Sequence, residues 1–235
     1  MMPVPVEIRR ASATFVDRER GRLTRHAFSF GSHYDPENVA FGPMVCHDDH
    51  LLSAGLGFED HPHADLEIVT WVLRGALVHA DSSGHATTVR PGTVQVLSAG
   101  GGVVHAETAD PGGGPTRFVQ VWLTPDERGG APAYTTAEVT LPDGELVPVA
   151  SGDDARAAVR LGTTGATFWV ARLPAGGTLT LPDAPRQHLY VASGALARSS
   201  LAQPLAEGDA FRITDTPGVE VTAAVPTELL LWTLP

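Results

Sequence analysis

Short apolar runs separated by turn residues recur through the middle of the chain. The segment 66–73 is apolar on both alternating sets of positions apart from Glu67 and Thr70, which predicts a strand buried on both faces. Gly, Pro, Asp and Ser stand between the runs, where tight turns need them. The strands predicted in this region are 66–73, 76–80, 86–89 and 93–97. Short strands at this spacing favour an all-β sandwich or a small barrel.

The second half of the chain repeats this pattern in a weaker form. The run IVTWVLRGAL ends at Leu77, and the run RQHLYVASGAL ends at Leu196. Between the two halves, the segment TPDERGGAPAY at 124–134 has the Pro, Gly and charge typical of a linker. We therefore predict two related β domains in tandem, at residues 1–135 and 136–235.

Composition and charge narrow the class of protein. The chain has 235 residues with 16 basic and 27 acidic side chains, and its net charge of −11 opposes binding to nucleic-acid phosphates or to anionic membranes. Cys46 is the single cysteine, so no intrachain disulfide is expected. The sequence shows neither the apolar run of a signal peptide nor a stretch long enough to cross a bilayer. We expect a soluble cytoplasmic protein.

Two pairs of residues carry the candidate chemistry. His61 and His63 stand together in DHPHADLEIV, and His105 and Glu107 stand together in VVHAE. Residues two apart on a strand point to the same face, so each pair can present its side chains to one point in space. Three imidazoles and one carboxylate, without a thiolate, suit a divalent ion of Fe, Mn, Ni, Cu, Co or Zn. The pattern predicts a transition-metal site and leaves the choice of metal open.

The other histidines have no partner at ligand spacing that also fits the predicted strands. We interpret them as surface or hydrogen-bonded residues: His26, His33, His47, His50, His79, His85 and His188. Glu67 is different because it shares its strand face with His61 and His63. It could ligate the metal directly, or it could orient a ligand by accepting a hydrogen bond from a ring nitrogen.

These motifs resemble those of the pirin-like proteins, which are bicupins of the cupin superfamily. The resemblance is dense in RHAFSFGSHYDPENVAFG, in GLGFEDHPHADLEIVTWVLRGALVHADSSG and in RPGTVQVLSAGGGVVHAE, and it continues more weakly to the end of the chain. It implies an all-β fold of two tandem cupin domains of the jelly-roll type. It also implies one divalent transition metal per chain, with iron favoured, held by His61, His63, His105 and Glu107.

The resemblance gives Glu67 a supporting role beside the metal ligands. In the second half, Thr180 and Pro182 stand where the histidine pair is expected, and no histidine follows His188. That half is therefore expected to bind no metal and to pack against or close the site.

The resemblance implies two classes of function. Some bacterial pirin-like proteins show quercetin 2,3-dioxygenase activity, so a flavonol-like molecule and O2 would be the substrates, and Glu107 would take the proton of the substrate hydroxyl. Pirins are also regarded as iron-dependent cofactors of transcription factors, so the alternative is a regulatory metal protein with a protein partner and no turnover. A cupin enzyme with another small-molecule substrate is a third possibility. The candidate pocket residues are Phe28, Phe30, Tyr34, Met44, Phe58 and Gln95.

Overall fold

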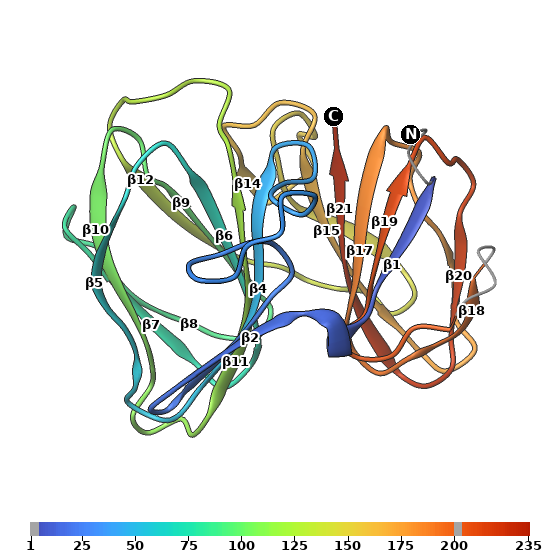
Figure 1. The fold of residues 1–235 in the computed structure, drawn as a ribbon, viewed down its shortest axis with the longest axis horizontal. Coiled ribbons are helices and arrows are strands. Elements are labelled where there is room, and N and C mark those ends of the chain that lie inside the picture. The colour runs from blue at the N-terminus through green and yellow to red at the C-terminus, as the bar shows by residue number, and fades with distance from the viewer. Residues whose placement is uncertain (1–4, 200–203) are drawn as a thin grey trace. The chain divides into compact units, whose positions relative to one another are not determined.

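The chain forms two compact β units, shown as a ribbon in Figure 1. The structure is a computed structural model that describes residues 5–199 and 204–235. The N-terminal unit comprises residues 15–139 with 161–163, and the C-terminal unit comprises the segment up to Thr14 with 140–160 and 164–235. Apart from a 3-10 helix at Ala11–Ala13, the elements of the described residues are strands. This confirms the all-β prediction, whereas the domain boundary at residue 135 stays a prediction.

The N-terminal unit is built from two sheets. Among the described residues, one sheet has seven strands in the order β12-β9-β6-β11-β4-β3-β2, and the other has four in the order β5-β10-β7-β8. The strands of the larger sheet are β2 (Phe15–Glu19), β3 (Arg22–His26), β4 (Met44–Leu52), β6 (Glu67–Arg74), β9 (Thr93–Ser98), β11 (Thr116–Leu123) and β12 (Ala133–Glu138). Those of the smaller sheet are β5 (Gly57–His63), β7 (Leu77–Asp81), β8 (Ala86–Val89) and β10 (Val103–Ala109).

The four strands predicted for this region are all present, with bounds that differ by at most one residue at each end. Strand β6 is buried at every position from Glu67 to Val72, as its apolar residues on both sets of alternating positions predicted. It lies in the interior of the seven-stranded sheet between β9 and β11.

The C-terminal unit repeats the two-sheet plan. Within the described part of the chain, its larger sheet has the order β1-β19-β17-β21-β15-β13-β14 and its smaller sheet the order β16-β20-β18. The strands of the larger sheet are β1 (Val6–Arg9), β13 (Leu146–Ser151), β14 (Val159–Arg160), β15 (Thr167–Leu173), β17 (Arg186–Ser193), β19 (Ala210–Thr214) and β21 (Thr227–Leu234). Those of the smaller sheet are β16 (Thr178–Thr180), β18 (Leu196–Ser199) and β20 (Glu220–Ala223). Strand β1 pairs with β19, so the start of the chain belongs to this unit.

The Gly-Ala-Leu repeat of the sequence marks the same local structure in both units. Gly75 and Gly194 both have φ of +82°, and a Cβ atom at either would lie within 3 Å of a backbone atom of the neighbouring strand. The Thr116 hydroxyl bonds both the N–H and the carbonyl of Ala76, at 3.1 and 2.9 Å. Thr227 makes the same pair of bonds to the residue after Gly194, at 3.1 and 3.0 Å. The sequence repeat therefore marks the same close contact between a glycine turn and a neighbouring strand in both units.

The interior of the N-terminal unit has a polar layer between two apolar clusters. One cluster is formed by Leu52, Val72, Leu77, Val89, Ala109 and Phe118, and the other by Ile68, Leu97, Ala99 and Val103. Along one face of strand β6 the layers follow one another: Val72 lies in the first cluster, Thr70 in the polar layer and Ile68 in the second cluster. Gln95 and Gln120 lie opposite Thr70 on the neighbouring strands β9 and β11, and the buried His79 and Glu107 of the smaller sheet complete the polar layer.

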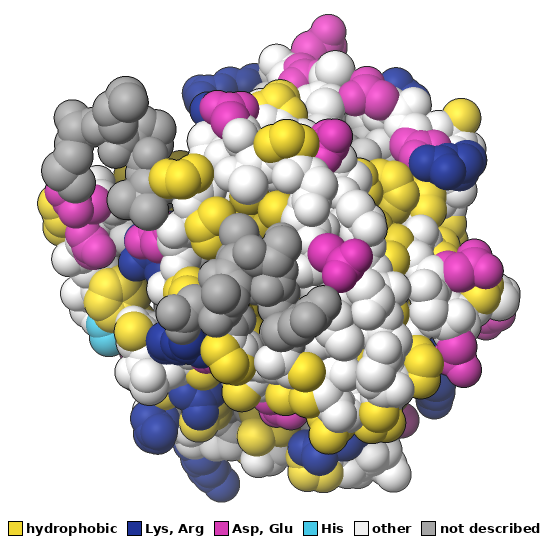
Figure 2. Space-filling view, turned by 90° about the vertical axis from the view of Figure 1, so that its right-hand side faces the viewer, with side chains coloured by type: hydrophobic (Ala, Val, Ile, Leu, Met, Phe, Trp, Pro, Cys, Tyr) yellow, Lys and Arg dark blue, Asp and Glu magenta, His cyan; other side chains and the backbone are white. Residues whose placement is uncertain are grey.

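One face of the surface carries charged side chains of both signs. On the face shown in Figure 2, basic and acidic side chains alternate with apolar and uncharged ones over the described residues. The described residues also contain no helix that is long and apolar enough to cross a membrane.

Gly57 allows the closest approach between β5 and β10. A Cβ atom at this position would overlap the carbonyl oxygen of Glu107 and lie 2.7 Å from the Cα atom of Thr108. We expect Gly57→Ala to push the strands apart and to lower the free energy of unfolding by about 1–3 kcal/mol, the usual cost of overpacking. Denaturant unfolding of the metal-free protein measures this.

Gly112→Ala is the matched control. Gly112 has no positive φ, and a Cβ atom there meets only the Asp110 carboxylate, at 3.8 Å. Equal stability losses in the two variants would show that the contact between β5 and β10 is not the cause.

Candidate metal centre

Strands β5 and β10 bring three of the predicted ligands together. The strands are antiparallel, and His105 lies directly opposite His61. The ring centroids of His61, His63 and His105 are 4.4 to 5.0 Å apart. One ligand nitrogen from each of the three lies within 4.8 Å of the others, which is the spacing of a group that can hold a metal ion.

Tight turns lie at the end of β5 and before the start of β10, next to the histidines. Asp65, just after His63, has φ of +54°, and its N–H donates to the carbonyl of Gly100 at 2.8 Å. Gly100, in the glycine run before His105, has φ of +52°, and a Cβ atom there would lie 2.7 Å from the carbonyl oxygen of Gly130. The glycines of SAGGG therefore serve a turn.

The histidine nitrogens suit a metal ion. Burial lowers the pKa of His63 and of His105 to about 4, so both rings are neutral at pH 7 and keep a lone pair for ligation. Nε2 of His63 and both ring nitrogens of His105 are buried without a hydrogen-bond partner among the described residues. His61 uses Nδ1 for a bond of 2.7 Å with the carbonyl of Glu59, which leaves Nε2 for ligation.

Glu107, the fourth predicted ligand, is held by two amide side chains. Its Oε1 accepts a hydrogen bond from Gln95 Nε2 at 2.8 Å, and its Oε2 accepts one from Gln120 Nε2 at 2.7 Å. Burial raises the pKa of Glu107, but the charge that His105 gains at low pH and the amide bonds of Gln120 and Gln95 outweigh burial and lower it below its ordinary value. The carboxylate is therefore ionised although it is 1% exposed.

The orientations of both amides are fixed by aromatic donors. The Tyr134 hydroxyl donates to Gln95 Oε1 at 2.9 Å, and Trp122 Nε1 donates to Gln120 Oε1 at 3.0 Å. Burial raises the pKa of Tyr134 to about 12, so the phenol stays a donor. Each amide must therefore turn its NH2 group toward Glu107.

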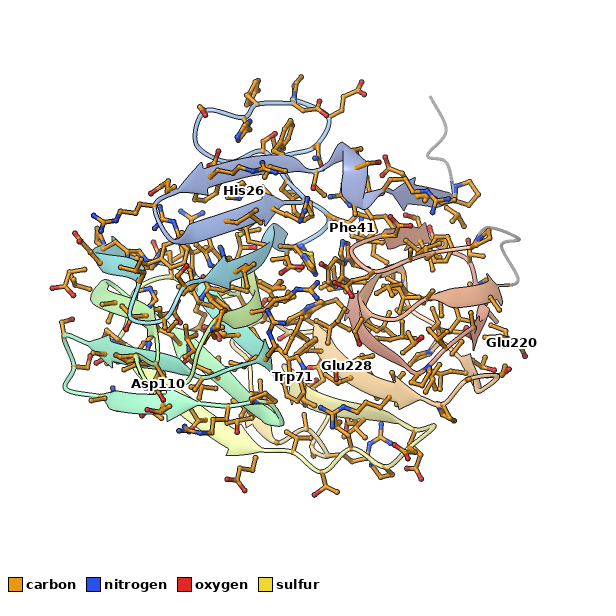
Figure 3. All side chains as sticks on the ribbon, turned by 90° about the horizontal axis from the view of Figure 1, so that it is seen from below. His26, Phe41, Trp71, Asp110, Glu220 and Glu228 are labelled. Carbon is orange, nitrogen blue, oxygen red and sulfur yellow. The ribbon has the colours of Figure 1, made fainter. Side chains whose placement is uncertain are left out.

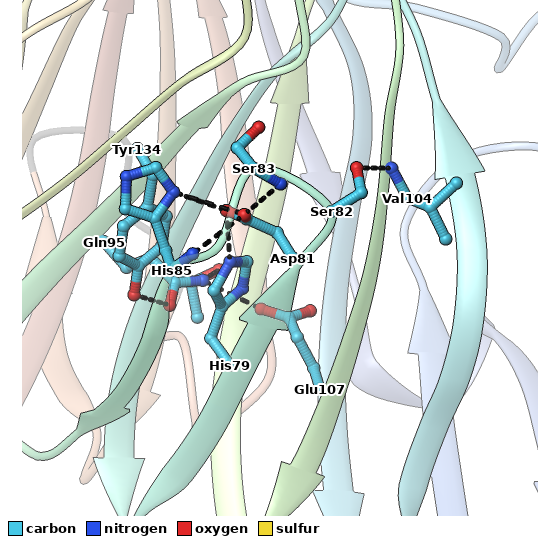
Figure 4. A network of polar contacts seen from close by, with 10 residues as sticks. His79, Asp81, Ser82, Ser83, His85, Gln95, Val104, Glu107 and Tyr134 are labelled. Atoms are coloured by element: carbon cyan, nitrogen blue, oxygen red, sulfur yellow. Dashed lines mark hydrogen bonds and ion pairs between the residues drawn. The ribbon is translucent and has the colours of Figure 1, made fainter.

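His79 is a residue of this site that the sequence interpretation missed. It lies on β7 directly opposite Glu107 of β10, and it forms a second group with His105 and Glu107 whose ligand atoms are within 4.8 Å of one another. Figure 4 shows His79 beside Glu107 in a network that also contains Asp81, His85 and Gln95. The interpretation of His79 as a hydrogen-bonded residue agrees with its bond to Asp81, but it did not foresee the possible ligand partners that another strand brings close.

Gln120 was also missed, although the sequence holds a signal for it. Gln95 and Gln120 both stand in Val-Gln-Val triplets within apolar strands, in TVQVLS and FVQVWL. A single polar residue at an inward position of such a strand must be satisfied by another buried polar group. The two triplets indicate one shared partner, which is Glu107.

Glu67 and Phe28 belong to neither group of candidate metal ligands among the described residues. The Glu67 carboxylate accepts hydrogen bonds from Ser98 Oγ at 2.9 Å and from the N–H of Gly162 at 3.1 Å. Its role in supporting the ligands stays a prediction. Phe28 is 1% exposed in the protein interior.

A pocket adjoins the histidine cluster, because His61 is one of its lining residues. Two of the candidate pocket residues, Phe30 and Phe58, also line it. Its aromatic walls are Phe30, Phe58 and Trp122, and its polar walls are Asp17, Glu19, Arg22, Thr24, His26, Asp48, His50, His61, Glu107 and Gln120. Of the remaining candidates, Tyr34 is 75% exposed and Met44 is fully buried.

A histidine and two aspartates join three strands at the end of this pocket. His26, labelled in Figure 3, bonds Asp48 through Nδ1 at 2.8 Å and Asp17 through Nε2 at 3.2 Å. His33 bonds the other oxygen of Asp17 at 2.7 Å. Burial lowers the pKa of His26, but its bonds to Asp48 and Asp17 and their charges outweigh burial and raise it above its ordinary value.

The C-terminal unit has apolar residues at the positions of the ligands. Ala109 and Ala223 each accept a backbone hydrogen bond from the glycine that precedes β5 or β16, so Val221 corresponds to Glu107 and Val219 to His105. Leu181, whose N–H donates to the Val219 carbonyl at 2.8 Å, corresponds to His61. The three are at most 2% exposed.

The sequence comparison had placed Thr180 at the position of a histidine, which was wrong by one residue. Thr180 lies on the exposed face of β16. Between His105 and Glu107 of β10 the partner strand β5 carries an extra residue, a β-bulge that β16 lacks. The bulge shifts the sequence register of the two units by one, and a one-residue shift moves a side chain to the other face.

Comparisons with known proteins agree with this architecture. The family model described as Pirin matches residues 8–123, and the one described as quercetinase C-terminal cupin domain matches residues 148–234. A Mycobacterium tuberculosis protein, provisionally named a quercetin 2,3-dioxygenase, is 43% identical over 234 residues, which cover 98% of this chain and 96% of the relative. A pirin-like protein of Caulobacter vibrioides is 36% identical over 213 residues, covering 88% and 90% of the two chains. The structure of a bacterial pirin from Escherichia coli in complex with nickel(II) matches with a TM-score of 0.89 at 27% identity, covering 98% of this chain and 99% of that one.

The raised pKa of His26 predicts a pH-dependent contribution to stability. Asp17 and Asp48 face the ring, with His33 and His50 nearby, and the folded protein binds the His26 proton more tightly than the unfolded chain does. The contribution is therefore fully present below the unfolded pKa of about 6.5 and is lost as the pH rises through the raised folded pKa. We expect the stability difference between metal-free wild type and His26→Gln to shrink as the pH rises from 6 to 9.

Denaturant unfolding across this pH range measures the difference. His85→Gln is the control, because His85 also bonds an aspartate but its side chain is 42% exposed. A wild-type advantage that stays constant or grows with pH would contradict the assignment.

Proposed function

Because the chain belongs to the pirin family, we propose that it is a metal-dependent dioxygenase of the quercetin 2,3-dioxygenase type, acting on a flavonol-like molecule with O2. The observation that carries the proposal is the pocket, whose lining includes both His61 and Glu107. Phe30, Phe58 and Trp122 give this pocket aromatic walls suited to a flat ring system. The name given to the 43% identical relative supports the same reaction class.

The proposed metal ligands are His61, His63, His105 and Glu107. The neutral, unpartnered imidazole nitrogens and the ionised carboxylate fit a divalent transition metal, with iron favoured and Mn, Ni, Co, Cu or Zn as alternatives. When bound, the metal supplies Lewis acidity that makes a substrate hydroxyl easier to deprotonate, together with the redox chemistry of O2.

Glu107 is the proposed catalytic residue. A carboxylate with a lowered pKa is a weak base, so it can take a proton only from a hydroxyl that has been made acidic. Gln95 and Gln120 hold its two oxygens in place, so the proton acceptor is preorganised beside the pocket. The aromatic walls orient the substrate ring and exclude water from it.

The ligand set predicts different effects of two substitutions on metal occupancy. We expect His63→Ala to lose most of the bound metal, because it removes one of four ligands. Glu67→Ala removes a carboxylate that bonds Ser98 and Gly162 instead, so its loss of affinity is expected to stay within the about 10- to 100-fold range of supporting residues. Elemental analysis after dialysis against a metal buffer measures both, and equal losses would place Glu67 among the ligands.

The proposed reaction predicts metal-dependent oxygen uptake. Protein reconstituted separately with iron, manganese, nickel, cobalt and copper is expected to consume O2 with quercetin in at least one case. Oxygen uptake is measured together with loss of flavonol absorbance, and free metal and His61→Ala serve as controls. If no metal gives turnover above these controls, the regulatory alternative replaces the dioxygenase.

Glu107→Gln tests the base within the same assay. The amide can ligate weakly but cannot accept the proton, so turnover is expected to fall in preparations that keep metal. The new NH2 group also faces an NH2 group of Gln95 or Gln120, so folding is checked by the thermal midpoint. Unchanged turnover in a folded, metal-loaded variant would remove the role of Glu107 as base.

A further inference from the structure

The tautomer of His79 is fixed by a carboxylate. Its Nε2 lies 3.2 Å from Oδ2 of Asp81, and the Asp81 side chain is 1% exposed. Asp81 also accepts hydrogen bonds from the N–H groups of Ser83 at 2.8 Å and His85 at 3.2 Å. These hydrogen bonds favour the ionised form of the Asp81 carboxylate. Nε2 must therefore carry the proton, because Asp81 can only accept. This tautomer places the lone pair on Nδ1.

Nδ1 of His79 has no hydrogen-bond partner among the described residues, although the residue is 0% exposed. Buried nitrogen acceptors are normally satisfied. The ring cannot turn away freely, since it stacks on Tyr134 with the centroids 4.3 Å apart and the planes at 12°. His79 donates one N–H to a carboxylate, and its other nitrogen is buried near further possible ligand atoms. This is the arrangement of a metal-binding histidine.

The surroundings of His79 supply further ligand atoms. His79, His105 and Glu107 each offer one within 4.8 Å of the others, and all three are buried. His61 and His63, which form the other group with His105, are only half-buried. The two groups share His105, so they define adjacent positions at different depths.

We propose that His79 is a metal ligand, and that His79, His105 and Glu107 form an inner metal position beside the outer position, whose proposed ligands are His61, His63 and His105 together with Glu107. The inference rests on the proposed metal centre but is independent of the proposed reaction, because it concerns binding of the metal alone. One ion is expected to occupy either position, since the two share a ligand.

Cobalt(II) binding to variants that lack the outer position tests this inference. The double variant His61→Ala/His63→Ala keeps the inner donors and is expected to bind one Co²⁺ per chain with reduced affinity. Adding His79→Ala to this background is expected to weaken binding at least tenfold further. Adding His85→Ala instead is the matched control, because His85 bonds the same Asp81 carboxylate but belongs to neither group. Equilibrium dialysis gives the affinity, and the visible absorption of Co²⁺ reports the change of ligands.

The outcomes separate the inference from the proposed function. Absence of Co²⁺ binding to the wild type would overturn the metal centre itself. Binding to the wild type but not to the folded double variant would overturn the inner position alone, as would equal affinities with and without His79. The thermal midpoint without metal establishes folding, and His61→Asn/His63→Asn replaces the alanine pair if that pair does not fold.

Discussion

The interior of the N-terminal unit is organised around the buried carboxylate of Glu107. An ionised carboxylate in a protein interior is costly unless hydrogen bonds replace its water, and a hydrogen bond to a charged group contributes about 1.5–3 kcal/mol. Gln95 and Gln120 supply those bonds, and Tyr134 and Trp122 fix the direction in which the two amides donate. The polar layer between the two apolar clusters follows from this requirement. Any change to one member leaves another buried polar group without a partner.

The C-terminal unit shows the same fold without that charge. Val221, Val219 and Leu181 occupy the positions of Glu107, His105 and His61, and all belong to one continuous apolar cluster. A core of this kind needs no layer of amides. The order of the central strands, β9-β6-β11-β4 in one unit and β19-β17-β21-β15 in the other, and the contact at Gly-Ala are common to both units, so this arrangement does not depend on the polar layer. The polar layer serves the site.

Much of the fold could be predicted from the sequence, and so could the two i, i+2 pairs of proposed ligands, because both depend on local periodicity. Strand β6 follows from an apolar run, and His61 and His63 follow from i, i+2 spacing on one strand. His79 could not be found in this way, because its neighbour Glu107 is 28 residues away along the chain and is brought close by the pairing of β7 with β10. The bulge in β5 could not be predicted from the sequence either. Because of it, the alignment of the two halves by sequence was shifted by one residue at Thr180.

The charges around the pocket favour some substrates over others. Asp17, Glu19 and Asp48 line it together with Glu107, while Arg22 is paired with Glu19 at 2.5 Å and stacks over Phe58 at 4.2 Å. A substrate that carries a carboxylate would meet several like charges in a partly desolvated space, which costs binding energy. A neutral aromatic molecule with hydroxyl groups meets acceptors for its O–H donors and apolar walls for its rings. The same acidic wall favours a cation near the histidines, so the electrostatics of the pocket favour the metal and a neutral, hydroxylated aromatic substrate together.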